Sequence, residues 1–386
     1  MRFDWDIIQA DKFIDFNPKE TIRKGELSKK VAMERLQPYT RDISGYELTP
    51  FNGGSKFRNG DTLMARITPC LENGKTAQVN ILENDEVGFG STEFIVMREI
   101  PGVSDSDFIY YLALSPFWRN KAIKSMVGSS GRQRVQQSVL GSVELCVPSL
   151  PEQKEIAHTL RALDNKIENN TKINHHLEQI AKAIFKSWFV DFEPFGSTMP
   201  DDWRETELGE VAALSAGGDK PSVSSPMLTE ECQVPIFSNG IDNFGLYGYT
   251  DRPKITDECV TVSARGTIGY VCLRQDPFVP IVRLVTAIPN NKFITAKYLY
   301  LYLSSIHIAG VGTTQQQLTV PDFKKYRILV PNLEAVEDFT RMVDPMFEAI
   351  HHKRVENARL AETRDTLLPP LMSGEIPVTN DELNNN

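Results

Sequence analysis

The segment that decides the fold runs from Pro151 to Trp188 and reads PEQKEIAHTLRALDNKIENNTKINHHLEQIAKAIFKSW. It contains no glycine, and its only proline is its first residue. Apolar and amide side chains recur at alternating steps of four and three residues, which is typical of a helix packed along another helix. The segment therefore predicts one long helix that needs a helical partner. Its seam consists of Ile156, Leu160, Leu163, Ile167, Asn170, Asn174, Leu177, Ala181, Ile184 and Trp188.

A second helix with the same pattern is predicted near the carboxyl end of the chain. The polar residues recur in it too, because Asn170 and Asn174 correspond to Lys353 and Asn357. Buried polar residues in a seam commonly fix the register of paired helices, so we expect Asn174 and Asn357 to meet near the middle of the pair. Alternatively, these side chains face solvent where the seam loosens. The second seam consists of Phe339, Val343, Met346, Ile350, Lys353, Asn357, Leu360, Arg364, Leu367 and Leu371.

The segments in front of the two helices also repeat. Residues 65–68 (Ala-Arg-Ile-Thr) match residues 264–267 (Ala-Arg-Gly-Thr), and Val147-Pro148 matches Val330-Pro331. We expect an aromatic amphipathic helix in each segment, at 107–126 and 296–306, and a β-rich run in each, at 91–97 and 278–286. The chain is thus predicted to be two copies of a mixed α/β domain followed by a long helix.

The order of these parts predicts an α+β architecture. The first helix leaves one domain and enters the other, so the second helix must run back antiparallel to pair with it. At about 1.5 Å per residue, a first helix of about 38 residues would span about 57 Å. We expect two repeated domains joined by a long antiparallel two-helix coiled coil with pseudo-two-fold symmetry. The parts are a domain at 1–150, a spacer helix at 151–196, a domain at 197–332, a spacer helix at 333–376 and a disordered tail at 377–386.

Composition restricts the class of protein. The 386 residues carry a net charge of −9, and 41% are apolar, as in ordinary globular proteins. Residues 333–386 hold 5 basic and 11 acidic side chains, so most of the negative charge lies there and not on the domains. No apolar run approaches the length of a membrane span. Five cysteines without a CxxC pair favour a reducing cytoplasm over a disulfide framework or a zinc site.

Motifs for catalysis and cofactor binding are missing from the sequence. There is no Gly-Lys-Ser/Thr phosphate loop, no GxGxxG that opens a helix, and no Asn/Asp-Pro-Pro-aromatic motif of an amino-methyltransferase. The pairs His175-His176 and His351-His352 are poor metal ligands, because adjacent residues do not share a helix face. We therefore expect a non-catalytic protein with no cofactor and no metal.

Polar recognition chemistry remains, and it occurs in both halves. Each half has an arginine at the end of a predicted strand and a glycine-started polar loop before its long helix. Arginine can donate two hydrogen bonds to guanine and glutamine can bond adenine in the major groove, while lysines suit phosphates. A solvated surface is the alternative for each group taken singly. The candidate DNA-binding residues are Arg66, Lys75, Arg132, Gln133, Arg134, Ser238, Asn239, Arg265, Thr313, Thr314, Gln315, Gln316 and Gln317.

Four stretches of the chain match a known protein family. They are Gly60-Asp-Thr-Leu-Met-Ala-Arg66, Leu145-Cys-Val-Pro-Ser-Leu-Pro-Glu-Gln-Lys-Glu-Ile156, Ile184-Phe-Lys-Ser-Trp-Phe-Val-Asp-Phe192 with Pro194-Phe195, and Arg364-Asp-Thr-Leu-Leu-Pro-Pro-Leu-Met-Ser-Gly-Glu-Ile376. With these stretches and the two-fold repeat, the chain resembles the specificity (S) subunits of type I restriction-modification enzymes over essentially its whole length. The resemblance implies two target-recognition domains, each contacting one half of a split site in double-stranded DNA. It further implies that the paired helices dock two methyltransferase (M) subunits, through which restriction (R) subunits join.

The second half departs from the first, because Gln315–Gln317 stands where Arg132–Arg134 would be expected. That difference is expected if the two half-sites differ in sequence. Two other hypotheses stay open: a fused modification enzyme, which the missing catalytic motif disfavours, and a coiled-coil scaffold without direct DNA contact. Alanine substitutions in the two polar loops separate the scaffold from a DNA-binding subunit.

Overall fold

The computed structural model describes residues 5–129, 131–310 and 316–378. The chain forms two compact units, Met1–Thr171 with Val355–Asn386 and Lys172–Arg354. Each of the two long helices crosses the boundary between the units, so each contributes residues to both.

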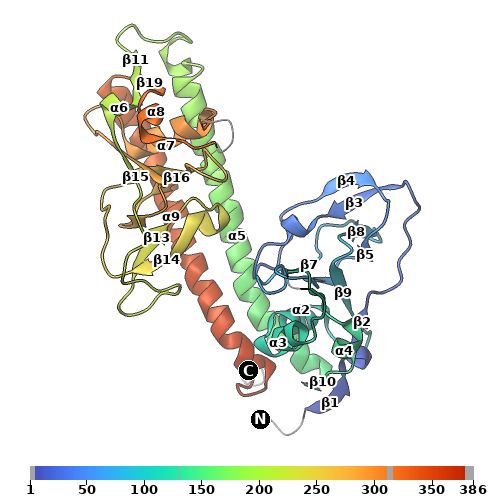
Figure 1. Cartoon of the computed structure of the whole chain (residues 1–386). Coiled ribbons are helices and arrows are strands. Elements are labelled where there is room, and N and C mark those ends of the chain that lie inside the picture. The colour runs from blue at the N-terminus through green and yellow to red at the C-terminus, as the bar shows by residue number, and fades with distance from the viewer. Residues whose placement is uncertain (1–4, 130, 311–315, 379–386) are drawn as a thin grey trace, which may run out of the picture. The chain divides into compact units, whose positions relative to one another are not determined.

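The long helices are α5 (Leu150–Phe189) and α9 (Leu333–Met372), each of forty residues. Figure 1 draws each as one ribbon, α5 in green and α9 in orange to red. The two long helices expected from the heptad pattern are therefore confirmed. Pro151 lies in the first turn of α5, where a missing N–H does no harm. Gly374 follows α9 at positive φ, a conformation that glycine adopts easily and that commonly ends helices.

The helices run antiparallel where they contact each other inside each unit. In the first unit, Asp164 of α5 bonds to Arg364 of α9, and the later residue Asn170 bonds to the earlier residue Asn357. In the second unit, the carboxyl-terminal part of α5 meets the amino-terminal part of α9, where the rings of Phe189 and Phe339 lie 4.9 Å apart. A continuous coiled coil through both units, and the pseudo-two-fold relation, stay predictions.

The polar break in the seam takes a specific form in the first unit. Asn170 is 0% exposed, and its Nδ2 donates to Oδ1 of Asn357 at 2.9 Å. Asn357 in turn donates to the carbonyl of Ile167 at 3.3 Å. The sequence predicted that Asn357 meets Asn174. In the structure Asn357 bonds to Asn170 instead. Asn174 belongs to the second unit. The other predicted seam residues divide into two groups. Those that are buried are Ile156, Leu160, Ala181, Phe339, Val343, Ile350, Arg364 and Leu371, and those that are partly exposed are Leu163, Ile167, Asn174, Leu177, Ile184, Trp188, Met346, Lys353, Leu360 and Leu367.

The described residues of the first unit form three sheets and two clusters of buried apolar side chains. Only the β3–β8 pair is parallel among the described strands of this unit. The strands, in the order in which they pair, are β1 (Asp6–Gln9) with β10 (Glu144–Val147); β2 (Ile14–Phe16), β9 (Phe94–Glu99), β6 (Thr62–Ala65) and β7 (Thr76–Gln78); and β4 (Glu47–Pro50), β3 (Leu27–Val31), β8 (Gly88–Gly90) and β5 (Ser55–Phe57).

The aromatic helix expected at 107–126 is wrong in one respect, because it is two helices. These are α2 (Ser106–Leu114) and α3 (Pro116–Lys124). Pro116 disfavours helical backbone at the residue before it, and Ser115 is extended at φ −60° and ψ 144°. The Ser115 hydroxyl then accepts the N–H of Trp118 and caps α3. The unit also contains α1 (Ala10–Phe13), the 3-10 turn η1 (Met33–Arg35) and α4 (Gln137–Gly141).

The second unit repeats this plan with fewer strands. The helix expected at 296–306 is confirmed as α7 (Ala296–Ser305). The β run expected at 278–286 is wrong as one strand, because residues 281–284 turn between two strands. The strands, in pairing order, are β11 (Arg204–Glu207) with β19 (Arg327–Val330); β12 (Ala212–Ala216), β18 (Val285–Pro289), β15 (Cys259–Val262) and β16 (Val271–Arg274); and β14 (Leu246–Thr250), β13 (Val234–Phe237) and β17 (Val279–Pro280). The remaining short helices are η2 (Glu193–Phe195), α6 (Leu208–Val211), η3 (Asp242–Gly245) and α8 (Val320–Lys324).

The internal repeat is visible element by element. Three elements of the first half have counterparts of equal length in the second half: α4 and α8, β10 and β19, and α5 and α9. Each counterpart begins the same number of residues later in the chain. The four-stranded sheet β2-β9-β6-β7 of the first unit and the four-stranded sheet β12-β18-β15-β16 of the second have corresponding strand orders. The described ends of the two polar loops, residues 132–134 and 316–317, therefore stand at corresponding places before α4 and α8.

Candidate nucleic-acid interface

In the first unit, the fold brings Arg66 together with the loop of residues 132–134. Arg66 directly follows β6, and Ile67 forms a β-bridge with Arg134. The Arg66 guanidinium donates to the carbonyl of Val135 at 3.2 Å, and the Val135 N–H donates back to the Arg66 carbonyl at 2.8 Å. Strand end and loop thus form one surface, although Arg66 and Val135 lie far apart in the sequence.

Arg134 is held by a carboxylate that sequence analysis missed. Its Nε lies 3.0 Å from each oxygen of Glu93, and its Nη2 lies 2.7 Å from Oε1. Hydrogen bonding to Glu93 raises the pKa of the Arg134 guanidinium, which keeps it charged. Arg132 is exposed and makes no side-chain bond within the described part of the chain. No pattern in the sequence links Glu93 to this loop, so only the fold identifies it.

Gln133 and Lys75 are partly exposed and more constrained than Arg132. The Gln133 backbone makes two bonds with Thr68, in which its N–H donates to Oγ1 and its carbonyl accepts the Thr68 N–H, both at 3.0 Å. The Lys75 ammonium donates to the carbonyl of Met33 at 3.1 Å. The loop is therefore fixed in place by backbone bonds, which presents Arg132 on a defined support.

The second unit places Arg265 beside its polar loop in the same way. Gln317 Oε1 accepts from Arg265 Nη2 at 3.0 Å, and the Leu318 N–H donates to the carbonyl of Ala264 at 3.0 Å. Gln316 is exposed and Gln317 partly exposed. The candidates Thr313, Thr314 and Gln315 lie outside the described residues.

Ser238 and Asn239 lie beside this surface, but Asn239 is engaged internally. Its Nδ2 donates to the carbonyl of Val282 at 2.6 Å, and its Oδ1 accepts the N–H of Ala264 at 2.7 Å. Ser238 donates its backbone N–H to the carbonyl of Gly245 at 2.8 Å. The amide of Asn239 therefore has its donor and its acceptor occupied by backbone groups.

Two cavities of the first unit differ in charge. One, of about 510 Å³, is lined by Lys19, Lys56 and Arg66, together with Glu20. The Glu20 carboxylate is neutralised by Arg58 at 2.6 Å and Arg98 at 2.7 Å, so the basic groups dominate. A phosphate suits such a site.

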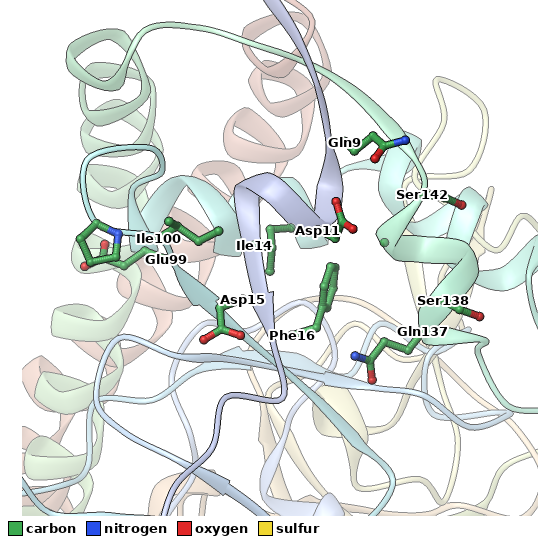
Figure 2. A pocket seen from close by; sticks show the side chains of 12 residues that line it. Gln9, Asp11, Ile14, Asp15, Phe16, Glu99, Ile100, Gln137, Ser138 and Ser142 are labelled. Atoms are coloured by element: carbon green, nitrogen blue, oxygen red, sulfur yellow. The ribbon is translucent and has the colours of Figure 1, made fainter.

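The second cavity, of about 860 Å³, is acidic (Figure 2). Asp11 and Asp15 line it near β2, and Glu99 lies at the end of β9. Among the described residues that line it, none carries a positive charge. The cavity therefore repels DNA phosphates, and it marks a side of the unit that we do not assign to DNA.

The described part of the chain contains no group of side chains suited to hold a metal ion. No three side chains among histidine, cysteine, aspartate and glutamate converge there as a metal site would require. All five cysteines are free thiols. Among the described helices, none has the length and apolar character needed to cross a membrane.

Comparison with known proteins identifies a family. A family model described as the type I restriction modification DNA specificity domain matches residues 4–179 and 200–358. The type I restriction enzyme HindI specificity subunit of Haemophilus influenzae is 27% identical, over 87% of this chain and 90% of that protein. The MjaIX specificity subunit of Methanocaldococcus jannaschii is 26% identical, over 71% of this chain and 69% of that protein.

A solved structure shares the fold. The S subunit of a type I restriction-modification system from M. genitalium superposes with a TM-score of 0.58 at 18% identity, over 96% of both chains. At that level of identity the likeness shows the fold alone.

Proposed function

Because the chain belongs to the family of type I restriction-modification specificity subunits, we propose that it selects the DNA sequence on which a methyltransferase complex acts. Residues 1–150 and 197–332 serve as two target-recognition domains, each contacting one half of a bipartite, gapped site. The chain itself is non-catalytic in this proposal, and the chemistry belongs to its partners.

The observation that carries the proposal is the recurrence of one arrangement in both units. An arginine that follows a central strand, Arg66 or Arg265, lies against the polar loop that precedes the long helix. Arg132 in one unit and Gln316 in the other are exposed on these loops. Because arginine favours guanine and glutamine favours adenine, the two half-sites are expected to differ.

The first unit separates groups for bases from groups for phosphates. Arg132 is free to reach a base edge, whereas Arg134 is held by Glu93 and suits the backbone. The basic cavity of Lys19, Lys56 and Arg66 offers a further place for a phosphate. Phosphate contacts fix orientation and base contacts give specificity, so both kinds are needed.

The long helices act as a spacer and as the docking surface for other subunits. Two M subunits bind the outward faces of α5 and α9, and R subunits join through the M subunits. A helix of about forty residues spans about 60 Å, at about 1.5 Å per residue. The distance between the domains, and hence the gap in the DNA site, follows from helix length in this proposal.

Mapping methylated adenines in host DNA, with and without this chain, tests the proposal. The expected result is a bipartite methylated sequence that disappears when the chain is deleted. Exchanging residues 197–332 for those of another family member should change one half-site only. If alanine at Arg132–Arg134 and at Gln315–Gln317 leaves both half-sites unchanged, the chain is a scaffold and not the DNA-contacting subunit.

A further inference from the structure

The turn between β17 and β18 in the second unit has an unusual backbone. Val282 and Arg283 have φ values of +53° and +61°. A β-branched residue such as valine rarely adopts positive φ, so the turn is strained. Such strain persists only where neighbouring groups hold it, and it is concentrated at functional sites. Both side chains are exposed, Val282 to 49%.

Backbone bonds hold this turn against the segment after β12. The Val282 N–H donates to the Gly218 carbonyl at 2.9 Å, and the Arg283 N–H donates to the Gly217 carbonyl at 3.0 Å. A Cβ on Gly217 would lie 2.8 Å from the backbone of Ile281, so glycine is required for this approach. The exposed Lys254 places its ammonium beside Gly218. Arg283 therefore projects from a rigid turn with a second positive charge nearby.

The side chain of Asn239 connects this turn to the one that carries Arg265. Its Nδ2 donates to Val282 at 2.6 Å and its Oδ1 accepts from Ala264 at 2.7 Å, the residue before Arg265. The hydroxyl of Ser263 also donates to the Asn239 carbonyl at 3.2 Å. One amide thus fixes two exposed turns, each bearing an arginine.

We propose that Arg283 is a DNA-contacting residue of the second unit, that it acts together with Arg265, and that Asn239 positions both without touching DNA. This inference rests on the proposed function, because it assigns residues within the same DNA-binding surface. Arg283 makes no ion pair with a described carboxylate, so its charge is available to a phosphate. Arg265 has its guanidinium shared with Gln317 and lies beside the polar loop.

The experiment uses the complex of this chain with its methyltransferase subunits and DNA that contains the complete site. For Arg283→Ala, we expect affinity to fall about tenfold and the slope of log affinity against log salt to fall by about one, as for the loss of one phosphate contact. Arg283→Lys should retain most of the affinity. Arg252→Ala, which removes another exposed arginine of the same unit, is the matched control and should change neither quantity.

The role of Asn239 is tested by a double-mutant cycle. Asn239→Ala should weaken recognition of the second half-site about as much as the double substitution Arg265→Ala with Arg283→Ala does. Added to a chain that already carries that double substitution, Asn239→Ala should cause little further loss. Asn239→Asp keeps the acceptor for Ala264 and loses the donor to Val282, so its effect should vanish in the Arg283→Ala chain alone. Recognition of the first half-site should be unchanged in every variant. Circular dichroism of each variant at the assay temperature should match the wild-type chain, which shows that the second unit is folded.

Two results overturn the inference. In the first, the Arg283→Ala complex binds DNA with unchanged affinity and unchanged salt slope. In the second, Asn239→Ala weakens recognition of the second half-site just as much in the chain that lacks Arg265 and Arg283 as in the wild-type chain. Both differ from failure of the proposed function, in which the wild-type complex itself would show no preference for a bipartite site.

Discussion

Arg364 of α9 and Asp164 of α5 form an ion pair inside the first unit, with Nη1 and Oδ1 2.7 Å apart and side chains 4% and 5% exposed. The Tyr111 hydroxyl of α2 donates to the other Asp164 oxygen at 2.7 Å. Arg364 also donates to the carbonyl of Tyr39 at 3.2 Å. The pair therefore ties the domain of this unit to its helices at one point.

Removing one partner of this pair should be strongly destabilising. Asp164→Ala leaves the buried Arg364 with only the exposed carboxylate of Asp365, at 2.8 Å, as an ionic partner. We expect the free energy of unfolding to fall by about 3 kcal/mol. Replacing both residues by apolar side chains, Asp164→Leu with Arg364→Met, should be less harmful than the single change. Chemical denaturation of the whole chain measures both. The exposed neighbour Asn165→Ala is the control, and an equal loss there would contradict the prediction.

Glu93 should restrain DNA binding by the first unit. Glu93→Gln removes a negative charge and weakens the hold on Arg134, so affinity for DNA of any sequence should rise a few-fold at low salt. Titration of non-specific DNA at several salt concentrations measures the change. Glu72→Gln removes an exposed charge elsewhere in the same unit and serves as the control. Equal effects of the two substitutions would refute a specific role for Glu93.

Lengthening the helices should lengthen the gap in the recognised DNA. One heptad inserted into each helix adds about 10.5 Å, or about 3 bp at about 3.4 Å per base pair. Mapping of methylated adenines should then show both half-sites unchanged and the gap longer by about 3 bp, or no methylation where the helical phase of DNA cannot be met. An active variant with the original gap would rule out the spacer role.

Glu20 should make stability depend on pH in the acid range. The hydrogen bond from Arg58, and that from Arg98, hold the pKa of Glu20 below its ordinary value of 4.5. This contribution is fully present above that ordinary value and is lost as pH falls through the lower folded value. Glu20→Gln should therefore destabilise by about 1–2 kcal/mol at pH 7 and progressively less in acid. Unfolding across pH, with Glu72→Gln as control, tests it; a difference independent of pH would contradict it.

Cys259 should resist alkylation while the chain is folded. Burial raises the pKa of its thiol to about 12, so about one thiol in ten thousand is thiolate at pH 8. Cys146 is exposed and provides the internal comparison. Mass spectrometry after iodoacetamide treatment should find Cys146 modified in the native chain and both modified after denaturation. Native labelling of Cys259 as fast as Cys146 would show that the core around it opens.

Much of the fold could be predicted from spacing alone, while the partners at the candidate site could not. The heptad pattern predicted both long helices, and the repeat that relates them reappears in α4, α8, β10 and β19. The break at Ser115 has a signal in the sequence, because Pro116 disfavours helical backbone at the residue before it. The turn at Val282 and Arg283 has no such signal, because valine and arginine there favour a strand.

The sequence by itself determined the two long helices and the repeat that relates them, since helical periodicity is a local property of residues three and four apart. Only the tertiary structure decided which side chains meet. Arg134 lies 41 residues from Glu93, Asn239 lies 43 from the carbonyl it holds, and Arg364 lies 200 from Asp164. Contacts across such separations depend on how whole elements pack, which no local pattern records. For that reason Arg132 could be chosen from the sequence, whereas Glu93, Asn239 as a positioning residue and Arg283 required the fold.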